Sequence, residues 1–479
     1  MADGLLRSQA GQGLVEYILI LVVVVSVALG LLYQFHCGTA DAVDGAITVI
    51  YQGCYQRRRI SMNTKFDPNS QGTLTANLGL SNDPVPLEPY RSQTFFKLER
   101  DKIFRRAWLL MGRVEELPEP GAYVVKEVPP CNVSLIITHA KNGSIQAFYN
   151  SCSHRGSKIA TETSGKLSRF VCPYHKWTYS NDGDLIGVPD QANFFDIDKK
   201  SCGLTPVATD TWEGWVFINL ATEPEVSLEE FLGPMKEHLS GMLYPGADNP
   251  VVFSAKLDAN WKVVADAFIE TYHIPHIHPQ TIGSTFSSPI NPHSRLLDAY
   301  SLGTHQAVSM YGNPDYQLNP NNQAEILGHS GGDAGSVIAA SNQEAAAAFL
   351  KHPAINPTAS THWSMDVNNL FPHVQIDCGP GGFWTHYFWP LTPNTSLYEG
   401  RFYMEKASNM RERYLQELYL GRVADIILED LVNVGRTQEG IDTGGKMFMQ
   451  LQDSEVAIRH SMSRIMKWVE ADTVREALS

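Results

Sequence analysis

Short β-branched runs alternate with turn residues between positions 123 and 148, and this pattern predicts a small antiparallel β domain. The runs are Tyr123–Val125, Val133–Ile137 and Ile145–Phe148. Pro129–Pro130 and Asn142–Gly143 separate them, and such pairs are typical of turns.

A second antiparallel sheet is predicted between Asp366 and Met404. Successive side chains of a strand point to opposite faces, so its most aromatic segment has two distinct faces. One face carries Phe383, Thr385, Tyr387 and Trp389, and the other carries Trp384, His386 and Phe388. Either face is a candidate lining for an apolar cavity, and core packing explains each single residue at least equally well.

Apolar residues at helical spacing predict a helix that runs from Asn260 to His273. Pro275 is expected to end it, because proline disrupts a helix interior. From Glu405 onward the pattern is helical to the end of the chain. Strands and helices in separate blocks favour the α+β class.

The segment from Ser301 to Pro357 is irregular, and it is rich in Asn, Gly, Pro and Ala. Within it, Ser341–Glu344 opens an Ala-rich helix with a capping-box pattern. We expect this loop-rich insertion to cover a site as a lid.

Composition narrows the class of protein further. The chain has 479 residues, enough for more than one core, and its net charge of −14 argues against nucleic acid as a partner. The seven cysteines are odd in number and irregularly spaced, which argues against a secreted disulfide framework. In a reducing compartment, a tight Cys/His cluster indicates metal ligation.

The first residues differ from the rest of the chain. Tyr17–Tyr33 has no charge and is a candidate transmembrane helix at the short end of the usual length, with a buried helix as the alternative. Gly11 and the Glu16–Tyr17 pair, followed by this apolar run, resemble the start of a type IVb (Flp-like) bacterial pilin. That resemblance covers about the first 35 residues.

We expect the functional chain to begin at Met62. Arg57–Arg59 lies just upstream, and two of these arginines are explained as the in-frame translation of a purine-rich ribosome-binding site. Residues 1–61 are therefore interpreted as a pilin-like leader outside the functional protein. A true membrane anchor is the alternative.

Two short loops carry the chemistry of a first metal site. Cys152-x-His154 and Cys172-x-x-His175 each offer one thiolate and one imidazole. Structural zinc sites usually place two cysteines in one loop and two histidines in the other. The mixed pairing favours a [2Fe–2S] cluster with the cysteines on one iron and the histidines on the other, and zinc is the alternative.

These loops resemble the Rieske domain of ring-hydroxylating oxygenase α subunits, which are Rieske non-haem iron enzymes. The likeness extends over Cys152–Gly156 and over Cys172–Trp177. In addition, Trp212–Asn219 resembles the strand that closes that domain in the family.

The resemblance also implies a mononuclear iron site. The family pattern of an acid, two residues, a histidine, four residues and a second histidine matches Glu270, His273 and His278. Two histidines and one carboxylate leave open positions for O2. The third ligand is expected at Asp430, with Glu429 as the alternative. His276 fits the spacing less well, and we interpret it as a supporting or surface residue.

Glu270 is three residues before His273, so on a helix the two would share one face. The resemblance implies that Glu270 bridges electron transfer between subunits rather than binding iron. Most ring-hydroxylating members have Asp here, whereas amine-oxidising relatives also use Glu. Asp266 is expected to support the ligands without binding iron.

The resemblance spans about residues 83–472 and implies a domain order. Residues 62–105 form a helical segment packed on the catalytic domain, residues 106–222 form a small antiparallel β Rieske domain, and residues 223–479 form a helix-grip catalytic domain. A homotrimer or an α3β3 assembly is implied, because cluster and iron of one chain lie too far apart.

The implied function is hydroxylation or dihydroxylation of an aromatic substrate by O2. Electrons come from NAD(P)H through a separate reductase, directly or through a ferredoxin. One alternative is monooxygenation, as in N- or O-demethylation or quaternary amine oxidation. Another is an electron-transfer Rieske protein. The expected location is the bacterial cytoplasm, or the inner membrane if residues 1–61 are a real anchor.

Overall fold

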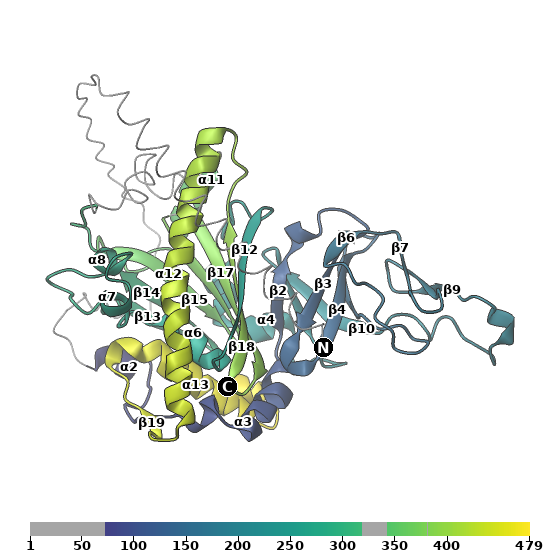
Figure 1. Ribbon diagram of the computed structural model, residues 1–479, viewed down its shortest axis with the longest axis horizontal. Helices are drawn as coiled ribbons and strands as arrows, with labels where there is room; N and C mark the ends of the chain where they lie inside the picture. Colours follow the sequence, from purple (N-terminus) through teal and green to yellow (C-terminus); the bar gives the residue numbers. More distant parts are fainter. Residues whose placement is uncertain (1–71, 319–342, 381) are drawn as a thin grey trace, which may run out of the picture. The chain divides into compact units, whose positions relative to one another are not determined.

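Two seven-stranded antiparallel sheets organise the chain (Figure 1). The computed structural model describes residues 72–318, 343–380 and 382–479. The apolar run at 17–33, the proposed start at Met62 and residues 319–342 of the predicted lid lie outside these ranges. Within them, no helix is both long and apolar enough to cross a membrane.

The first sheet has the strand order β2-β11-β10-β5-β4-β3-β6. Its strands are β2 Leu109–Arg113, β3 Ala122–Val128, β4 Val133–His139, β5 Ile145–Tyr149, β6 Ser164–Lys166, β10 Pro206–Trp212 and β11 Trp215–Asn219. The three predicted strands are confirmed within β3, β4 and β5. All seven lie inside the predicted segment 106–222, although the domain boundaries stay a prediction.

A small three-stranded sheet extends this domain. It consists of β7 Arg169–Val171, β8 Thr178–Ser180 and β9 Leu185–Gly187, in that order. The buried side chains of this part form a core of their own, which includes Phe170, Trp177 and Tyr179. Loops that join these strands to the first sheet therefore have a rigid support.

The second sheet has the order β12-β18-β17-β16-β15-β14-β13. Its strands are β12 Pro250–Leu257, β13 Asp298–Leu302, β14 His305–Tyr311, β15 Trp363–Leu370, β16 Val374–Gly379, β17 Gly382–Thr392 and β18 Thr395–Tyr403. The predicted sheet between Asp366 and Met404 is confirmed. The irregular structure expected from Ser301 is wrong for β14, because every residue of that strand is buried and no alternation marks it.

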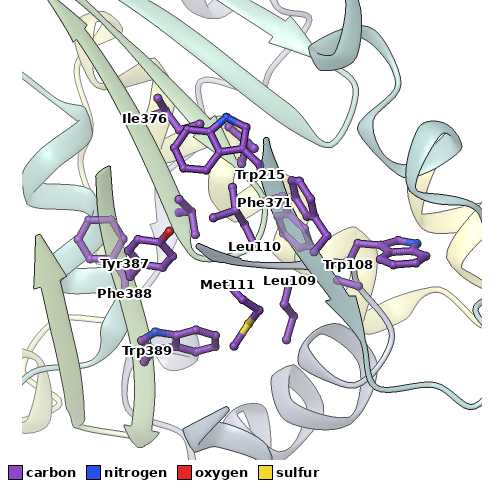
Figure 2. Close-up of a cluster of buried hydrophobic side chains, with 14 of the residues drawn as sticks. Trp108, Leu109, Leu110, Met111, Trp215, Phe371, Ile376, Tyr387, Phe388 and Trp389 are labelled. Atoms are coloured by element: carbon purple, nitrogen blue, oxygen red, sulfur yellow. The ribbon is translucent and has the colours of Figure 1, made fainter. Parts of the chain in front are cut away.

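The two faces of the second sheet have different partners. One face packs on the first sheet, and Figure 2 shows Leu110 and Trp215 from the first sheet in one cluster with Ile376 and Tyr387. Across this contact, Arg401 of β18 binds Glu116 at 2.9 Å. The other face lies under helices. Together these layers give the α+β architecture that the sequence predicts.

The helices α6 Trp261–Ile269, α12 Met410–Asp442 and α13 Val456–Glu470 contact the second sheet, and the short helix α11 Gln343–Leu350 contacts β17. Figure 1 draws α12 as the long yellow-green helix alongside that sheet. Asn260 caps α6 by accepting a hydrogen bond from the Lys262 N–H, and Asn409 caps α12 in the same way. A buried stripe that includes Ile427, Asp430 and Val434 faces inward along α12.

The helix predicted from Asn260 to His273 is shorter than expected. It ends at Ile269, and Glu270 has extended backbone with φ −119° and ψ 159°. Pro275 does not end a helix either, since it lies in the first turn of α7 Ile274–Ile277, where its missing N–H costs no hydrogen bond. The prediction that Glu270 and His273 share a helix face is therefore wrong.

The remaining elements are short. They are α2 Thr73–Asn77, β1 Val85–Pro86, η1 Glu88–Tyr90, α3 Gln93–Leu98, η2 Glu99–Phe104, η3 Val114–Glu116, η4 Pro129–Cys131, η5 Gln191–Asn193, α4 Leu228–Leu232, α5 Pro234–Leu239, α8 Gly283–Phe286, α11 Gln343–Leu350, β19 Phe448–Met449, η6 Asp453–Glu455 and α14 Val474–Leu478. The helical pattern expected after Glu405 is confirmed except at β19, which pairs with β1.

Candidate functional site: two metal centres

The same backbone pattern closes the two predicted Rieske loops. In each loop the cysteine carbonyl accepts a hydrogen bond from the N–H four residues later, at 2.8 Å from Gly156 and 3.0 Å from Lys176. Both of these residues have positive φ, 74° and 59°. The loops hold the four predicted donors, which are Cys152, His154, Cys172 and His175.

The donors pair by chemical type. The thiols of Cys152 and Cys172 each shift the pKa of the other, and the rings of His154 and His175 have centroids 4.6 Å apart. A tetrahedral zinc site needs all four donors around one point. Among the described residues, however, the group of three or more such donors within 4.8 Å lies elsewhere in the chain. One pair of thiols and one pair of imidazoles fit a cluster of two irons.

The surroundings shift the pKa values of the two thiols in opposite directions, and they orient one imidazole. Burial raises the pKa of Cys152, whereas at Cys172 the hydrogen bonds from backbone N–H groups outweigh burial and lower the pKa. The Tyr179 hydroxyl lies 3.1 Å from Cys152 Sγ, and Trp177 stacks on His154 at 5.0 Å. The sequence analysis treated Tyr179 only as part of a strand, since nothing in the pattern shows where its hydroxyl points.

Exposure differs between the two kinds of donor. Cys152 and Cys172 are buried, whereas His154 and His175 are only partly buried. The histidine side of the site therefore faces solvent more than the thiolate side.

The second site joins two segments far apart in the sequence. His273 and His278 flank α7, so one short helical turn sets their spacing, and the His278 N–H donates to the Ile274 carbonyl at 3.0 Å. Asp430 comes from the buried stripe of α12. The structure brings together all three predicted ligands.

Their donor atoms converge. Asp430 Oδ1 lies 3.3 Å from His273 Nε2 and 2.9 Å from His278 Nε2, and the donors of the three residues all lie within 4.8 Å of one another. Two imidazoles and one carboxylate are the donor set of non-haem Fe(II) centres. The residues present therefore fit a mononuclear iron, and their role as ligands stays a prediction.

A second carboxylate supports each histidine from behind. Glu270 hydrogen-bonds His273 Nδ1, and Glu429 Oε2 lies 2.7 Å from His278 Nδ1. Thr281 donates to the same Glu429 oxygen at 2.6 Å. Such contacts fix the orientation of a metal-binding imidazole and leave Nε2 for the metal. The structure thus places Glu429, the alternative ligand of the sequence analysis, in a supporting position.

The protonation of the histidines reflects these carboxylates. Burial alone would lower the pKa of His273, but its hydrogen bonds to Asp430 and Glu270 outweigh burial and raise the pKa to about 10. The pKa of His278 is raised in the same manner. Without a metal the site thus holds protons that a divalent cation replaces, as expected of a metal-binding cluster.

Asp266 and His276 have other surroundings. Asp266 accepts a hydrogen bond from the Tyr90 hydroxyl at 2.7 Å, and burial raises the pKa of Asp266 to about 7. Within the described residues it makes no hydrogen bond to His273 or His278. His276 is exposed and its ring lies near Tyr272 and His293.

A buried cavity of about 40 Å³ lies beside α6. Phe388 lines this cavity, and it belongs to one of the two strand faces that the sequence offered as a cavity lining. His273, His278 and Asp430 do not line it. Both ring nitrogens of His373 and Oε1 of Gln375 are buried there without a hydrogen-bond partner. A cavity of this volume has room for ordered water, which commonly satisfies buried polar groups.

The sequence matches two known protein families. Residues 107–208 match the Rieske [2Fe-2S] domain, and residues 248–471 match the ring hydroxylating alpha subunit (catalytic domain). The chain therefore contains an iron–sulfur electron-transfer domain joined to a mononuclear iron catalytic domain. These are the two domains of a Rieske oxygenase α subunit, and the relatives of the chain are Rieske oxygenase α subunits.

Individual relatives differ in chemistry. The glycine betaine monooxygenase oxygenase subunit of Pseudomonas aeruginosa is 31% identical over 226 residues, which are 47% of this chain and 51% of that protein. The chain thus spans about half the length of the curated relatives that it matches. The benzene 1,2-dioxygenase subunit alpha of Pseudomonas putida is 31% identical over 195 residues, which are 38% of this chain and 42% of that protein.

A solved structure has the same fold. Naphthalene 1,2-dioxygenase from Rhodococcus sp., bound to indole, aligns with a TM-score of 0.63 at 22% identity, covering 81% of this chain and 95% of its own. At this identity the likeness concerns the fold alone.

Proposed function

We propose that this chain is the catalytic subunit of an oxygenase that inserts oxygen from O2 into a small organic substrate. The observation that carries the proposal is the group His273, His278 and Asp430, in which each imidazole is supported by its own carboxylate. When bound, a [2Fe–2S] cluster and a mononuclear iron supply electron storage and O2 activation.

The side chains of the chain bind and orient. Cys152, His154, Cys172 and His175 would hold the cluster, with the partly exposed imidazoles facing a reductase or ferredoxin that carries electrons from NAD(P)H. His273, His278 and Asp430 would hold the iron. Three protein ligands leave coordination positions for O2 beside the substrate. In this proposal no protein side chain acts as a nucleophile.

Glu270 is proposed as the crossing point for electrons between subunits of a homotrimer or an α3β3 assembly. Its carboxylate contacts His273 Nδ1 and also accepts the Tyr272 and His273 N–H groups, so its position is fixed from three sides. The side chain is 12% exposed. A fixed, nearly buried carboxylate behind a ligand suits a hydrogen-bonded path.

Two substrate classes fit the proposed oxygenase. Hydroxylation or dihydroxylation of an aromatic ring agrees with the likeness to benzene 1,2-dioxygenase. Oxidation of a quaternary or N-methylated amine agrees with the likeness to glycine betaine monooxygenase and with Glu at position 270. The buried carboxylate of Asp377 favours the second class.

Iron analysis of the His273→Ala variant tests the proposal. We expect three irons per wild-type chain and about two in the variant, with the visible Rieske spectrum unchanged and substrate-dependent O2 consumption lost. The His276→Ala variant is the matched control, because His276 is exposed and lies outside the group. It should keep three irons.

The result also separates the electron-transfer alternative. A Rieske protein without oxygenase activity would hold two irons in the wild type, and its iron content would not respond to His273→Ala. That outcome, or full turnover in His273→Ala, would contradict the proposed second site.

A further inference from the structure

A buried carboxylate without a cation lies on the helix-covered face of the second sheet. Asp377 of β16 is 4% exposed, and its Oδ2 accepts a hydrogen bond from Trp384 Nε1 at 3.0 Å. Its Oδ1 is buried without any hydrogen-bond partner. Within the described residues no Lys or Arg forms an ion pair with it. A buried charge in this condition is costly unless something pairs with it.

The protein offers Asp377 one titratable neighbour. His386 Nε2 lies 3.2 Å from Asp377 Oδ2, while His386 Nδ1 lies 2.8 Å from the Tyr398 hydroxyl. Both contacts of Asp377 are therefore made by Oδ2, and they leave Oδ1 free on its other side.

Aromatic rings surround the same position. Phe268 of α6 packs on His386 at 4.8 Å and stacks on Tyr398 at 5.2 Å between ring centroids. Trp384 stacks on Phe402 at 6.3 Å. The faces of aromatic rings attract cations, and such groups of rings bind quaternary ammonium ions.

This cluster lies on the side of the sheet where the iron ligands are. Gln375, two residues before Asp377 on the same face, donates to the Ala265 carbonyl of α6 at 3.3 Å. Phe268, whose ring packs on His386 and Tyr398, lies five residues before the proposed iron ligand His273. The end of α6 thus connects the cluster to the neighbourhood of the proposed iron.

We propose that Asp377 and the rings of Phe268, Trp384, Tyr398 and Phe402 form the subsite that binds a methylated ammonium cation of the substrate. This inference rests on the proposed oxygenase function and deepens it by naming the substrate class. A neutral ring in the same place would leave Oδ1 of Asp377 unpaired, which is unfavourable for a buried acceptor. A cation supplies the missing charge.

A pair of ligands of equal shape tests the subsite. Choline and its neutral isostere 3,3-dimethylbutan-1-ol are titrated calorimetrically into the iron-loaded wild-type protein. We expect choline to bind at least tenfold more tightly. Equal affinity for both ligands, or binding of the neutral one alone, would overturn the proposal, and this comparison needs no variant.

Variants then assign the effect to one side chain. Asp377→Asn should lose the preference for choline by tenfold or more while keeping the visible Rieske spectrum and three irons. Asp366→Asn is the matched control, since Asp366 is a buried aspartate of the adjacent strand and Ser309, Asn356 and Trp363 satisfy its oxygens. It should keep the preference. An unchanged preference in Asp377→Asn would contradict the role of Asp377.

Failure of the subsite and failure of the oxygenase are distinguishable. A protein with three irons that consumes O2 with an aromatic hydrocarbon such as naphthalene, yet does not prefer choline, keeps the proposed oxygenase and loses the subsite. A protein with only two irons loses the oxygenase itself. In that case the choline titration still reports on Asp377 alone.

Discussion

At the scale of single residues, the Rieske site depends on hydroxyl and N–H groups that the motif does not include. Tyr179 is fully buried, accepts a hydrogen bond from the Ser153 N–H at 3.0 Å, and thus has its own proton free for Cys152 Sγ. Hydrogen bonds to cluster sulfurs stabilise the added electron and raise the reduction potential. The Tyr179 hydroxyl therefore contributes to the reduction potential of the cluster.

The Tyr179→Phe variant should have a lower cluster potential. A hydrogen bond to a charged group contributes about 1.5 kcal/mol, which corresponds to roughly 60 mV for a one-electron couple. Redox titration followed by the visible spectrum measures the change. A second conservative variant, Tyr123→Phe, serves as the control, because Tyr123 lies in the same core and its ring packs on Phe170. A potential unchanged in Tyr179→Phe would contradict the assigned donor.

At the scale of elements, one buried ion pair joins the N-terminal part of the described chain to α6. Lys262 Nζ lies 2.7 Å from Glu99 Oε1, and the two side chains are 2% and 1% exposed. Burial lowers the pKa of Lys262 and raises that of Glu99, even against their mutual attraction. The pair thus offsets only part of its desolvation cost, and each partner requires the other.

Lys262→Met should destabilise the protein by about 3 kcal/mol, since it leaves Glu99 as a buried acid without its cation. The double variant Glu99→Leu with Lys262→Met should recover most of the loss, because it removes both charges. Urea unfolding followed by circular dichroism measures both. If the double variant is as unstable as the single one, packing rather than charge explains the loss.

Elements also show how far sequence reasoning reaches. Spacing alone singled out Cys152, His154, Cys172 and His175, which the structure places in two matching loops. Runs of β-branched residues between turns were sufficient to predict β3, β4 and β5. The end of α6 was not predictable, because the sequence pattern continues past Ile269 while the backbone turns to place Glu270 against His273. The role of Glu429 depends on a contact 151 residues away, with His278, which no local pattern encodes.

At the scale of the whole molecule, buried acids make stability depend on pH. Burial raises the pKa of Asp366 from 3.8 to about 7, so the folded state favours its protonated form. The unfolded chain binds fewer protons than the folded one between these two values. Stability from this group is therefore complete below pH 4 and is lost as the pH rises through 7.

Asp366→Asn should flatten this dependence. The amide cannot ionise, so the variant should gain stability relative to wild type at pH 8, on the order of 2–4 kcal/mol, and little at pH 4. Its oxygen still accepts from Asn356 and Trp363, and its NH2 group donates to Ser309. Denaturant unfolding at both pH values measures the difference. An equal gain at both would indicate altered packing instead.

Helix α12 carries Glu429 and Asp430 as consecutive residues of a 33-residue helix, so one helix positions both a proposed iron ligand and the carboxylate that contacts His278. Occupancy of the iron site and docking of α12 are for that reason thermodynamically linked. A bound ion therefore stabilises the packing of α12 on the sheet. Any partner that tilts α12 would, by reciprocity, change how tightly the protein retains its metal.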